Sequence, residues 1–276
     1  MFFRSGRNTR SPLYISLIAV LAASIYVCVE SNRSLSASAR VAPLQQAALP
    51  RTADGKPNLQ GIWKVSNKAA LDLLDQTSTP GKSVVDGNQI PYLPAAATKK
   101  QQNFANRKTE DPLEKCFMPG VPRIMYLNYP FHIFQTKEHV AITFEWSQVF
   151  RLIYLTGKAA PSDLEFWMGD SRGKWDGDTL VVDVSSHNDK TWFDAAGNFH
   201  SDQLRLTERY TLLNADTLQY EVTVHDPKVF SKDWKMSMPL QRQKNMARVT
   251  EYQCQAELEE ANGAFERDPR TWYPKK

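Results

Sequence analysis

The chain has 276 residues, of which 42% are hydrophobic, 23% charged and 11% aromatic. This composition is typical of a folded globular protein and excludes a disordered chain, a collagen-like repeat and a coiled coil. The formal net charge of +4 comes mostly from the N-terminus, because residues 40–276 carry 30 basic and 29 acidic residues. Such a nearly neutral domain lacks the basic surface of a nucleic-acid-binding protein, so nucleic acid is not an expected partner.

A targeting segment is predicted at the N-terminus. Three arginines precede an uncharged apolar run over residues 12–29, which is long enough to cross a bilayer as a helix. Residues 37–39 match the small-residue pattern of a signal-peptidase site. Residues 1–39 are therefore expected to be a cleaved signal peptide or an uncleaved membrane anchor, with a buried core helix as the third alternative. Either of the first two places the remaining chain in the periplasm, soluble or tethered through residues 12–29.

Residues 40–57 are rich in Ala, Pro and Gln and are expected to form a linker, so that residues 58–276 make a single domain. Over residues 58–122, Pro and Gly interrupt every long element. A short helix is predicted over 69–76 and a polar helix or loop over 99–108. The region 58–122 is otherwise expected to be irregular, and to cover the mouth of a barrel as a lid or to brace its outside.

From residue 122 onward the hydrophobic pattern has a period of two, which predicts β-strands. Short links between these strands, and no alternation of strands with helices, favour an antiparallel meander closed or curled into a barrel. The expected fold is therefore mainly β. Strands are predicted over 139–146, 149–155, 180–184, 204–212, 218–224, 234–240 and 249–254. Residues 169–173 have the Gly-x-Ser-x-Gly spacing of a nucleophile elbow, but without a following helix they are interpreted as a turn or bulge.

Two charged residues stand on apolar faces of predicted strands. Glu208 alternates in phase with Leu206 and Tyr210, and Arg151 with Ile153. A buried unpaired carboxylate is costly, so Glu208 must be paired, protonated or exposed to a cavity. The pair is interpreted either as a buried ion pair that fixes strand register or as the polar floor of a ligand cavity; a bulge that turns one residue outward is the third alternative.

The densest polar stretch, residues 185–202, is too long for a tight hairpin and is expected to cap the barrel or to bind a ligand. Its imidazole and carboxylate groups are suited to proton transfer. The alternative is that the stretch is a loop stabilised by its own hydrogen bonds. Metal-ligand spacing is absent, so no metal site is expected. Candidate catalytic residues are Glu208, Arg151, His200 and Asp202; candidate ligand-binding residues are His187, Asp189, Trp167, Trp175, Trp192 and Tyr154. The tryptophans are expected either in the core or as a stacking surface for a sugar, sterol or aromatic ligand.

Cys116 and Cys254 form an even pair in the part of the chain expected to be exported. In an oxidising compartment such a pair suggests a disulfide, and two free buried thiols are the alternative.

Several motifs resemble those of a family of exported bacterial proteins, mostly of unassigned function, with a lipocalin-like (calycin-like) barrel. Asp170 departs from the family pattern, which often has His there. The resemblance implies export, the Cys116–Cys254 pair and the barrel, but no mechanism. It covers roughly residues 51–256 and rests on residues 51–63, 116, 119–123, 129–131, 151–154, 167–169, 175–183, 188–192, 200–202, 207–210 and 251–254.

The leading hypothesis from the sequence is an exported acid–base enzyme, an isomerase, lyase, hydratase or hydrolase, that needs no cofactor. It would act on a small, largely apolar molecule inside the barrel, with Glu208 as acid or base oriented by Arg151. The first alternative is a non-catalytic lipocalin-like protein that binds an apolar metabolite. The second is a structural envelope protein whose tryptophans contact a partner.

Overall fold

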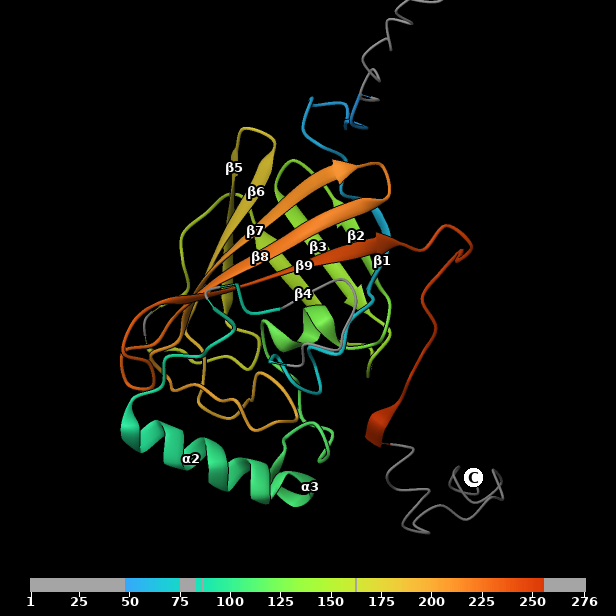
Figure 1. Ribbon diagram of the computed structural model, residues 1–276. Coiled ribbons are helices and arrows are strands. Elements are labelled where there is room, and N and C mark those ends of the chain that lie inside the picture. Colours follow the sequence, from blue (N-terminus) through green and yellow to red (C-terminus); the bar gives the residue numbers. More distant parts are fainter. Residues whose placement is uncertain (1–47, 75–82, 86, 162, 256–276) are drawn as a thin grey trace, which may run out of the picture. The chain divides into compact units, whose positions relative to one another are not determined.

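Nine strands close into a barrel in the computed structural model of the chain, which describes residues 48–74, 83–85, 87–161 and 163–255 (Figure 1). Each strand pairs with the next along the chain, and the first pairs with the last, so the sheet has no open edge. The mainly-β barrel fold is thus confirmed. The strands are β1 Gly61–Val65, β2 Phe131–Gln135, β3 His139–Phe144, β4 Phe150–Tyr154, β5 Asp170–Asp176, β6 Thr179–Ser185, β7 Arg205–Asn214, β8 Thr217–His225 and β9 Trp234–Arg242.

The predicted targeting segment, residues 1–39, lies outside the described residues. Within the described part of the chain, no helix combines the length and the apolar character that a membrane crossing requires. Residues 48–57 of the predicted linker are described, and Arg51 in them donates two hydrogen bonds of 2.7 and 2.9 Å to Asp178 beside the β5–β6 turn. This end of the linker therefore contacts the barrel.

The predicted alternation of apolar and polar side chains along the strands determines which residues form the core. Buried and half-buried residues alternate along β3, β7 and β8, and the buried ones point into the barrel. Apolar side chains of these strands form one continuous hydrophobic cluster with Trp63 of β1 and with Trp234 and Met236 of β9. Burial of this apolar surface, which is favourable by about 25 cal/mol per Å², is the main force that closes the barrel.

The meander has one exception, because β4 and β5 pair in parallel. Residues 155–169 return the chain to the end of the sheet where β4 begins, and parallel neighbours require such a crossover. The predicted turn over 169–173 is wrong, since β5 begins at Asp170. Gly173 is needed in this strand, because a Cβ there would lie 2.8 Å from side-chain atoms of Ile153 and Leu155.

The described residues of the region 58–122 are more ordered than predicted. They contain β1, which closes the barrel between β2 and β9, and the helices α2 (Pro94–Ala105) and α3 (Arg107–Glu110). A Pro in the first turn favours the start of α2. Residues 69–74 of the predicted short helix form turns, and 75–76 lie outside the described residues.

Helix α2 lies across one end of the barrel, next to the loops β6–β7 and β8–β9 (Figure 1). Asn103 Nδ2 donates to the carbonyl of Gly197 at 3.2 Å, and the amide of Leu93 donates to the carbonyl of Val229 at 2.9 Å. A 3-10 helix, η1 (Arg123–Tyr126), follows α3 and is buried. The predicted strand over 249–254 is wrong: Tyr252 makes only an isolated bridge with Trp146.

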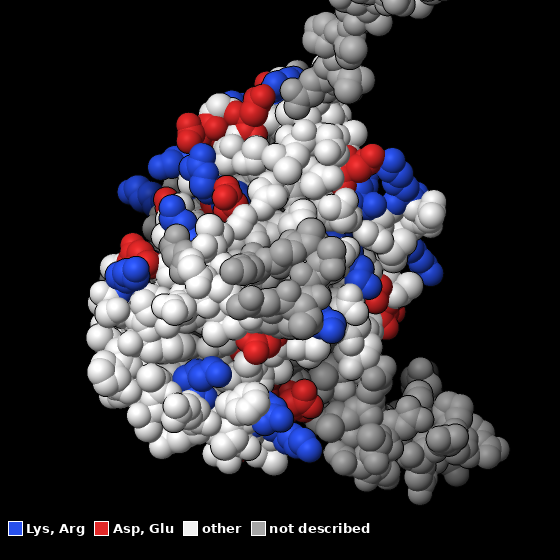
Figure 2. All heavy atoms as spheres, in the orientation of Figure 1, with Lys and Arg blue, Asp and Glu red and all other residues white. Residues whose placement is uncertain are grey.

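Charges of both signs are mixed on the surface. On the face shown in Figure 2, Lys and Arg side chains lie among Asp and Glu side chains. Exposed ion pairs such as Lys228–Asp202 and Lys244–Asp216, both at 2.7 Å, contribute to this mixing. Exposed pairs of this kind add little stability, so the fold depends on its core and on the buried polar groups described next.

Candidate functional site

The sequence-predicted pair, Arg151 and Glu208, meets inside the barrel. Both side chains are almost completely buried, at 2% and 0% exposure. The Arg151 guanidinium spans both carboxylate oxygens of Glu208, donating from one nitrogen to Oε1 at 3.0 Å and from the other to Oε2. Glu208 faces Val182 and Val222 in unbroken register. The alternative of a bulge that turns Glu208 outward is therefore wrong.

Protein groups saturate this ion pair. Tyr220 and Tyr210 donate their hydroxyls to Oε1 of Glu208 at 2.5 and 3.1 Å, and Arg151 also donates to Ser171 Oγ at 3.0 and 3.1 Å. Burial opposes the charge of Arg151, yet the Glu208 carboxylate holds its pKa above the usual value. Burial also raises the pKa of both tyrosines, and the carboxylate adds to this effect. The cluster ties together β4, β5, β7 and β8 as a hydrogen-bonded brace around the Arg151–Glu208 pair.

The two loop histidines are also buried, at 1% and 3% exposure for His187 and His200. His200 Nδ1 donates to the carbonyl of Ser201 at 2.9 Å, so Nε2 accepts from the Thr191 hydroxyl at 2.7 Å. His187 Nδ1 donates to the carbonyl of Leu204 at 3.2 Å. Burial lowers the pKa of His187 to about 3 and lowers that of His200 as well. Both imidazoles are therefore neutral at pH 7.

His187 Nε2 has no hydrogen-bond partner among the described residues. A Cβ at position 169 would lie 2.7 Å from this atom, and Gly169 has a φ of +65°, so the site requires glycine there. Asp202 lines a smaller pocket of about 330 Å³ together with His187, but its carboxylate accepts from Lys228 at 2.7 Å. Asp189 is exposed and lines a different pocket. In the described part of the chain, no three His, Cys, Asp or Glu side chains are grouped as metal ligands.

The candidate aromatic residues lie in three places. Trp175 stands beside the β5–β6 turn, where the Lys56 ammonium is 5.9 Å from its ring centroid. The Tyr154 ring packs under the Arg172 guanidinium, at 4.5 Å. Trp167 and Trp192 line one pocket, together with Asp189. The remaining candidates thus do not contribute to this site.

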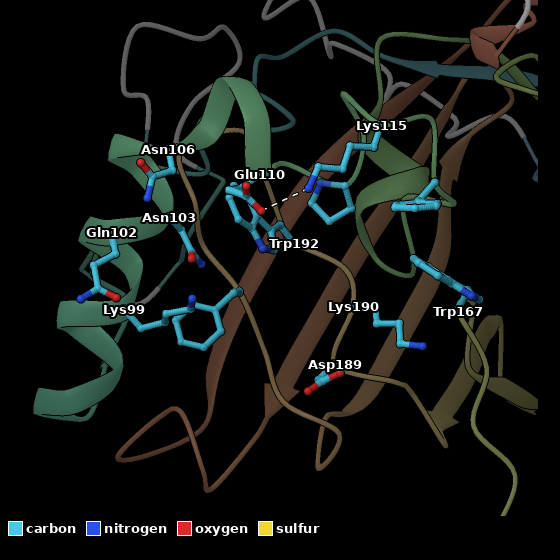
Figure 3. Close-up of a pocket in the computed structure, with 13 residues that line it drawn as sticks. Lys99, Gln102, Asn103, Asn106, Glu110, Lys115, Trp167, Asp189, Lys190 and Trp192 are labelled. Carbon is cyan, nitrogen blue, oxygen red and sulfur yellow. Dashed lines mark hydrogen bonds and ion pairs between the residues drawn. The ribbon is translucent and has the colours of Figure 1, made fainter. Parts of the chain in front are cut away.

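The pocket beside α2, here called the α2 pocket, has a volume of about 700 Å³ (Figure 3). Its aromatic lining includes Phe117, whose side chain is 49% exposed and whose ring centroid is 5.3 Å from that of Trp167. Opposite stand polar side chains of α2 and its C-cap, spaced so that they share one helix face. The lining residues are Lys99, Gln102, Asn103, Asn106, Glu110, Pro112, Lys115, Phe117, Trp167, Asp189, Lys190, Trp192 and Phe199.

Charges of both signs line the α2 pocket. Lys115 and Glu110 form an ion pair at 3.1 Å, and the Lys190 ammonium is 5.8 Å from the Trp167 ring centroid. In Figure 3, Lys190 and Asp189 approach the pocket from the side opposite α2. The site therefore offers aromatic faces together with donors and acceptors of hydrogen bonds, a combination that suits a ring-shaped polar ligand.

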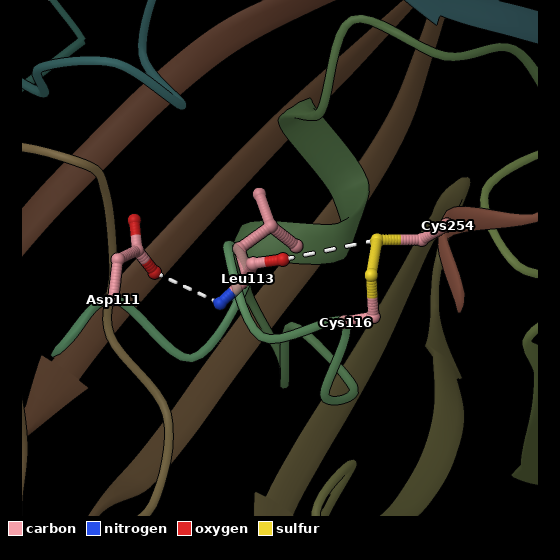
Figure 4. Close-up of a disulfide and its surroundings, with 4 residues drawn as sticks. All are labelled: Asp111, Leu113, Cys116 and Cys254. Carbon is pink, nitrogen blue, oxygen red and sulfur yellow. Dashed lines mark hydrogen bonds between the residues drawn. A yellow bond between two sulfur atoms is a disulfide. The ribbon is translucent and has the colours of Figure 1, made fainter. Parts of the chain in front are cut away.

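One wall of the α2 pocket is the 110–117 segment, which has two anchors. Asp111 accepts two hydrogen bonds from Arg123, at 2.7 and 2.8 Å, and both side chains are buried. Cys116 forms a disulfide with Cys254, which confirms the predicted pair (Figure 4). Tyr252, two residues before Cys254, is held against the barrel: its carbonyl accepts a hydrogen bond of 2.7 Å from the amide of Ser147. The disulfide therefore ties the pocket wall to the loop after β3.

Removing the disulfide is expected to weaken both the fold and the pocket. The variant with Cys116→Ser and Cys254→Ser loses a crosslink that closes 138 residues, and such losses cost about 2–4 kcal/mol. Urea denaturation of this variant beside the wild type measures the loss. An unchanged midpoint would show that the Asp111–Arg123 pair alone holds the wall.

Neither a scan against protein-family models nor a search of curated proteins finds a match to the chain. The closed barrel of nine strands is compatible with a lipocalin-like barrel, which agrees with the fold implied by the sequence motifs. The site therefore has to be interpreted from its own geometry.

Sequence reasoning missed most of the α2 pocket, including Lys115, Phe117 and Phe199. One signal was available: Lys99, Gln102, Asn103 and Asn106 follow the helical spacing of one face. A polar stripe of this kind also occurs on any solvated helix, so the stripe alone does not identify a site. The aromatic residues opposite it come from distant parts of the sequence.

Proposed function

We propose that the protein is a non-catalytic binding protein that takes a polyhydroxylated ring compound, such as a saccharide, in the α2 pocket. The observation that carries this proposal is the pairing of partly exposed Trp167 and Trp192 with the polar face of α2 across one pocket. Indole rings offer flat apolar surfaces to sugar rings, while amide and charged side chains reach the hydroxyls.

The mixture of charges favours a neutral ligand rich in hydroxyl groups. A hydroxyl both donates and accepts, so it matches lysines, carboxylates and amides at once. A strongly charged ligand would instead favour a lining of one sign, whereas this pocket holds three lysines and two acids. The same polar lining does not suit the largely apolar ligand expected from the sequence.

The buried cluster favours binding over catalysis. Glu208 is 0% exposed and its oxygens already accept from Arg151, Tyr210 and Tyr220. A general acid or base must reach its substrate directly or through one water. In this arrangement the partners of Glu208 occupy the positions that a substrate would need.

The proposed place of action is the periplasm, where the barrel is free or tethered through residues 12–29. The Cys116–Cys254 disulfide supports this location, because disulfides persist in oxidising compartments. A basic flank followed by an uncharged run is the further support.

A glycan microarray probed with the full-length protein tests the proposal, followed by calorimetry on the strongest hit. Trp192→Ala is expected to weaken binding at least tenfold, because it removes a stacking surface. Trp175→Ala is the matched control, since this partly buried tryptophan lies outside the α2 pocket, and it should bind like the wild type. The ligand should be recovered chemically unchanged.

Two results would overturn the proposal. One is the absence of any retained glycan. The other is equal binding by Trp192→Ala and Trp175→Ala, which would place the ligand elsewhere. Conversion of the bound glycan to a product would keep the site but end the non-catalytic interpretation.

A further inference from the structure

The aromatic residues of the α2 pocket fall into two pairs. Trp192 and Phe199 form an isolated antiparallel bridge, and residues directly opposite each other in such a bridge have their side chains on the same side. Phe117 and Trp167 form the other pair, with ring centroids 5.3 Å apart. In Figure 3, the side chains of Trp167 and Trp192 stand well apart from each other. One pocket therefore presents two separate aromatic surfaces.

The Trp192–Phe199 pair, here called the inner subsite, lies beside α2. Both side chains are half-buried. Gly197, two residues before Phe199, accepts a hydrogen bond of 3.2 Å from Asn103 Nδ2 of α2. Exposed amide side chains of this helix line the same pocket, and amides both donate and accept. The inner subsite can therefore stack one ring and bind its hydroxyls.

The Phe117–Trp167 pair, here called the outer subsite, is open to solvent. Phe117 is 49% exposed, and the Lys190 ammonium lies 5.8 Å from the Trp167 ring centroid. The Phe117 ring offers an apolar face, and the ammonium beside it offers donors to hydroxyl groups. A second ring can therefore bind here, while the rest of the ligand stays outside the pocket.

Close packing joins the two chain segments that carry the subsites. Gly120 has a φ of +73°, and a Cβ there would lie 2.5 Å from Oγ1 of Thr191. Thr191 directly precedes Trp192 of the inner subsite, and Gly120 follows Phe117 of the outer subsite by three residues. A ligand with two linked rings can thus contact both subsites at once. When its first ring is bound, its second ring meets the other subsite at a high effective concentration.

We infer that the α2 pocket binds the end of a linear β-1,4-linked oligosaccharide, with the terminal ring in the inner subsite and the next ring in the outer subsite. This inference rests on the function proposed above. Gluco-configured rings joined in this way carry their hydroxyls and linkages equatorially, so each ring keeps an apolar C–H face for stacking on an aromatic side chain. The chain they form is extended, which suits two stacking surfaces that stand apart.

Calorimetry of the full-length protein with glucose, cellobiose and cellotriose tests the inference. Cellobiose should bind at least tenfold more tightly than glucose, because its second ring reaches the outer subsite intramolecularly. Cellotriose should gain at most about twofold more, since its third ring extends into solvent. Equal affinities for glucose and cellobiose would overturn the inference and leave the proposed function standing. Binding of none of the three sugars would also overturn it, while the glycan array still decides the proposed function.

Substitution of Phe117 tests the outer subsite. Phe117→Ala should weaken cellobiose binding at least fivefold more than glucose binding, whereas Phe117→Tyr keeps the ring and should retain the wild-type difference. Phe150→Ala is the matched control, because Phe150 is 73% exposed and lies outside the α2 pocket. Trp192→Ala should weaken both sugars alike. A tenfold preference for cellobiose that survives in Phe117→Ala would overturn the assignment of the outer subsite.

Discussion

Glu208→Gln is expected to cost about 3–5 kcal/mol of folding free energy, because it leaves the Arg151 guanidinium buried without a counter-charge. The glutamine can still accept from Tyr210 and Tyr220 at the position of Oε1, so the loss measures the missing charge rather than a missing hydrogen bond. Urea denaturation at pH 7 measures it. A general acid or base in an open cavity would instead tolerate this substitution with little loss of stability.

A double variant provides the control. Arg151→Met together with Glu208→Gln removes both charges, and replacing a buried ion pair by groups of similar size is often close to neutral. The double variant is therefore expected to be more stable than Glu208→Gln alone, despite carrying one more substitution. The losses of stability in Arg151→Met and in Glu208→Gln are also measured separately. If these two losses add up to the loss in the double variant, Arg151 and Glu208 are not coupled and the brace described here is incorrect.

Acid should unfold the protein through His187. Its folded pKa of about 3 lies below the unfolded value of 6.5. The folded state thus binds fewer protons between these values, so stability is complete above pH 6.5 and is lost as the pH falls towards 3. At the acid end the loss from this group is about 4–5 kcal/mol. This contribution, measured as the difference in free energy of unfolding between the wild type and a variant without the imidazole, should fall steadily as the pH falls across this range.

His187→Gln should flatten this dependence, because glutamine does not ionise. His139→Gln, half-buried on β3, is the matched control and should keep the wild-type slope. Asp194 acts in the opposite direction over part of the range, since burial raises its pKa to about 6 and its contribution is lost as the pH rises through that value. Comparison of the two glutamine variants isolates His187, and equal slopes would contradict its assignment.

Six strands, β3, β4 and β6 to β9, were predictable because alternation is a local signal, whereas β1, β2 and β5 were not predicted. The same signal allowed a buried ion pair as one interpretation of Arg151 and Glu208. In β7, Glu208 interrupts an otherwise apolar face, and that exception indicated a carboxylate that is paired, protonated or exposed to a cavity. Arg151 gave the same signal on β4. The chemistry of the pair was not predictable, because whether a buried carboxylate meets a cavity or a set of hydroxyl donors depends on Tyr210 and Tyr220 and on how the strands close.

Polar elements were predicted only in part: β5 was missed, and α2 was expected as a polar helix or loop over 99–108. β5 reads Asp-Ser-Arg-Gly-Lys-Trp-Asp and lacks a clear apolar face, so only its pairing with β4 and β6 makes it a strand. Helix α2 buries just Ala96 and Asn103, and it therefore has no hydrophobic stripe. The α2 pocket joins this helix to Phe117, Trp167 and Trp192, and sequence spacing carries no information about that meeting.

The Cys116–Cys254 bond fixes one wall of the α2 pocket before any ligand arrives. A wall held in this way does not have to be ordered on binding, so less of the interaction free energy is lost as conformational entropy. For the proposed site, the disulfide therefore provides preorganisation as well as stability of the fold.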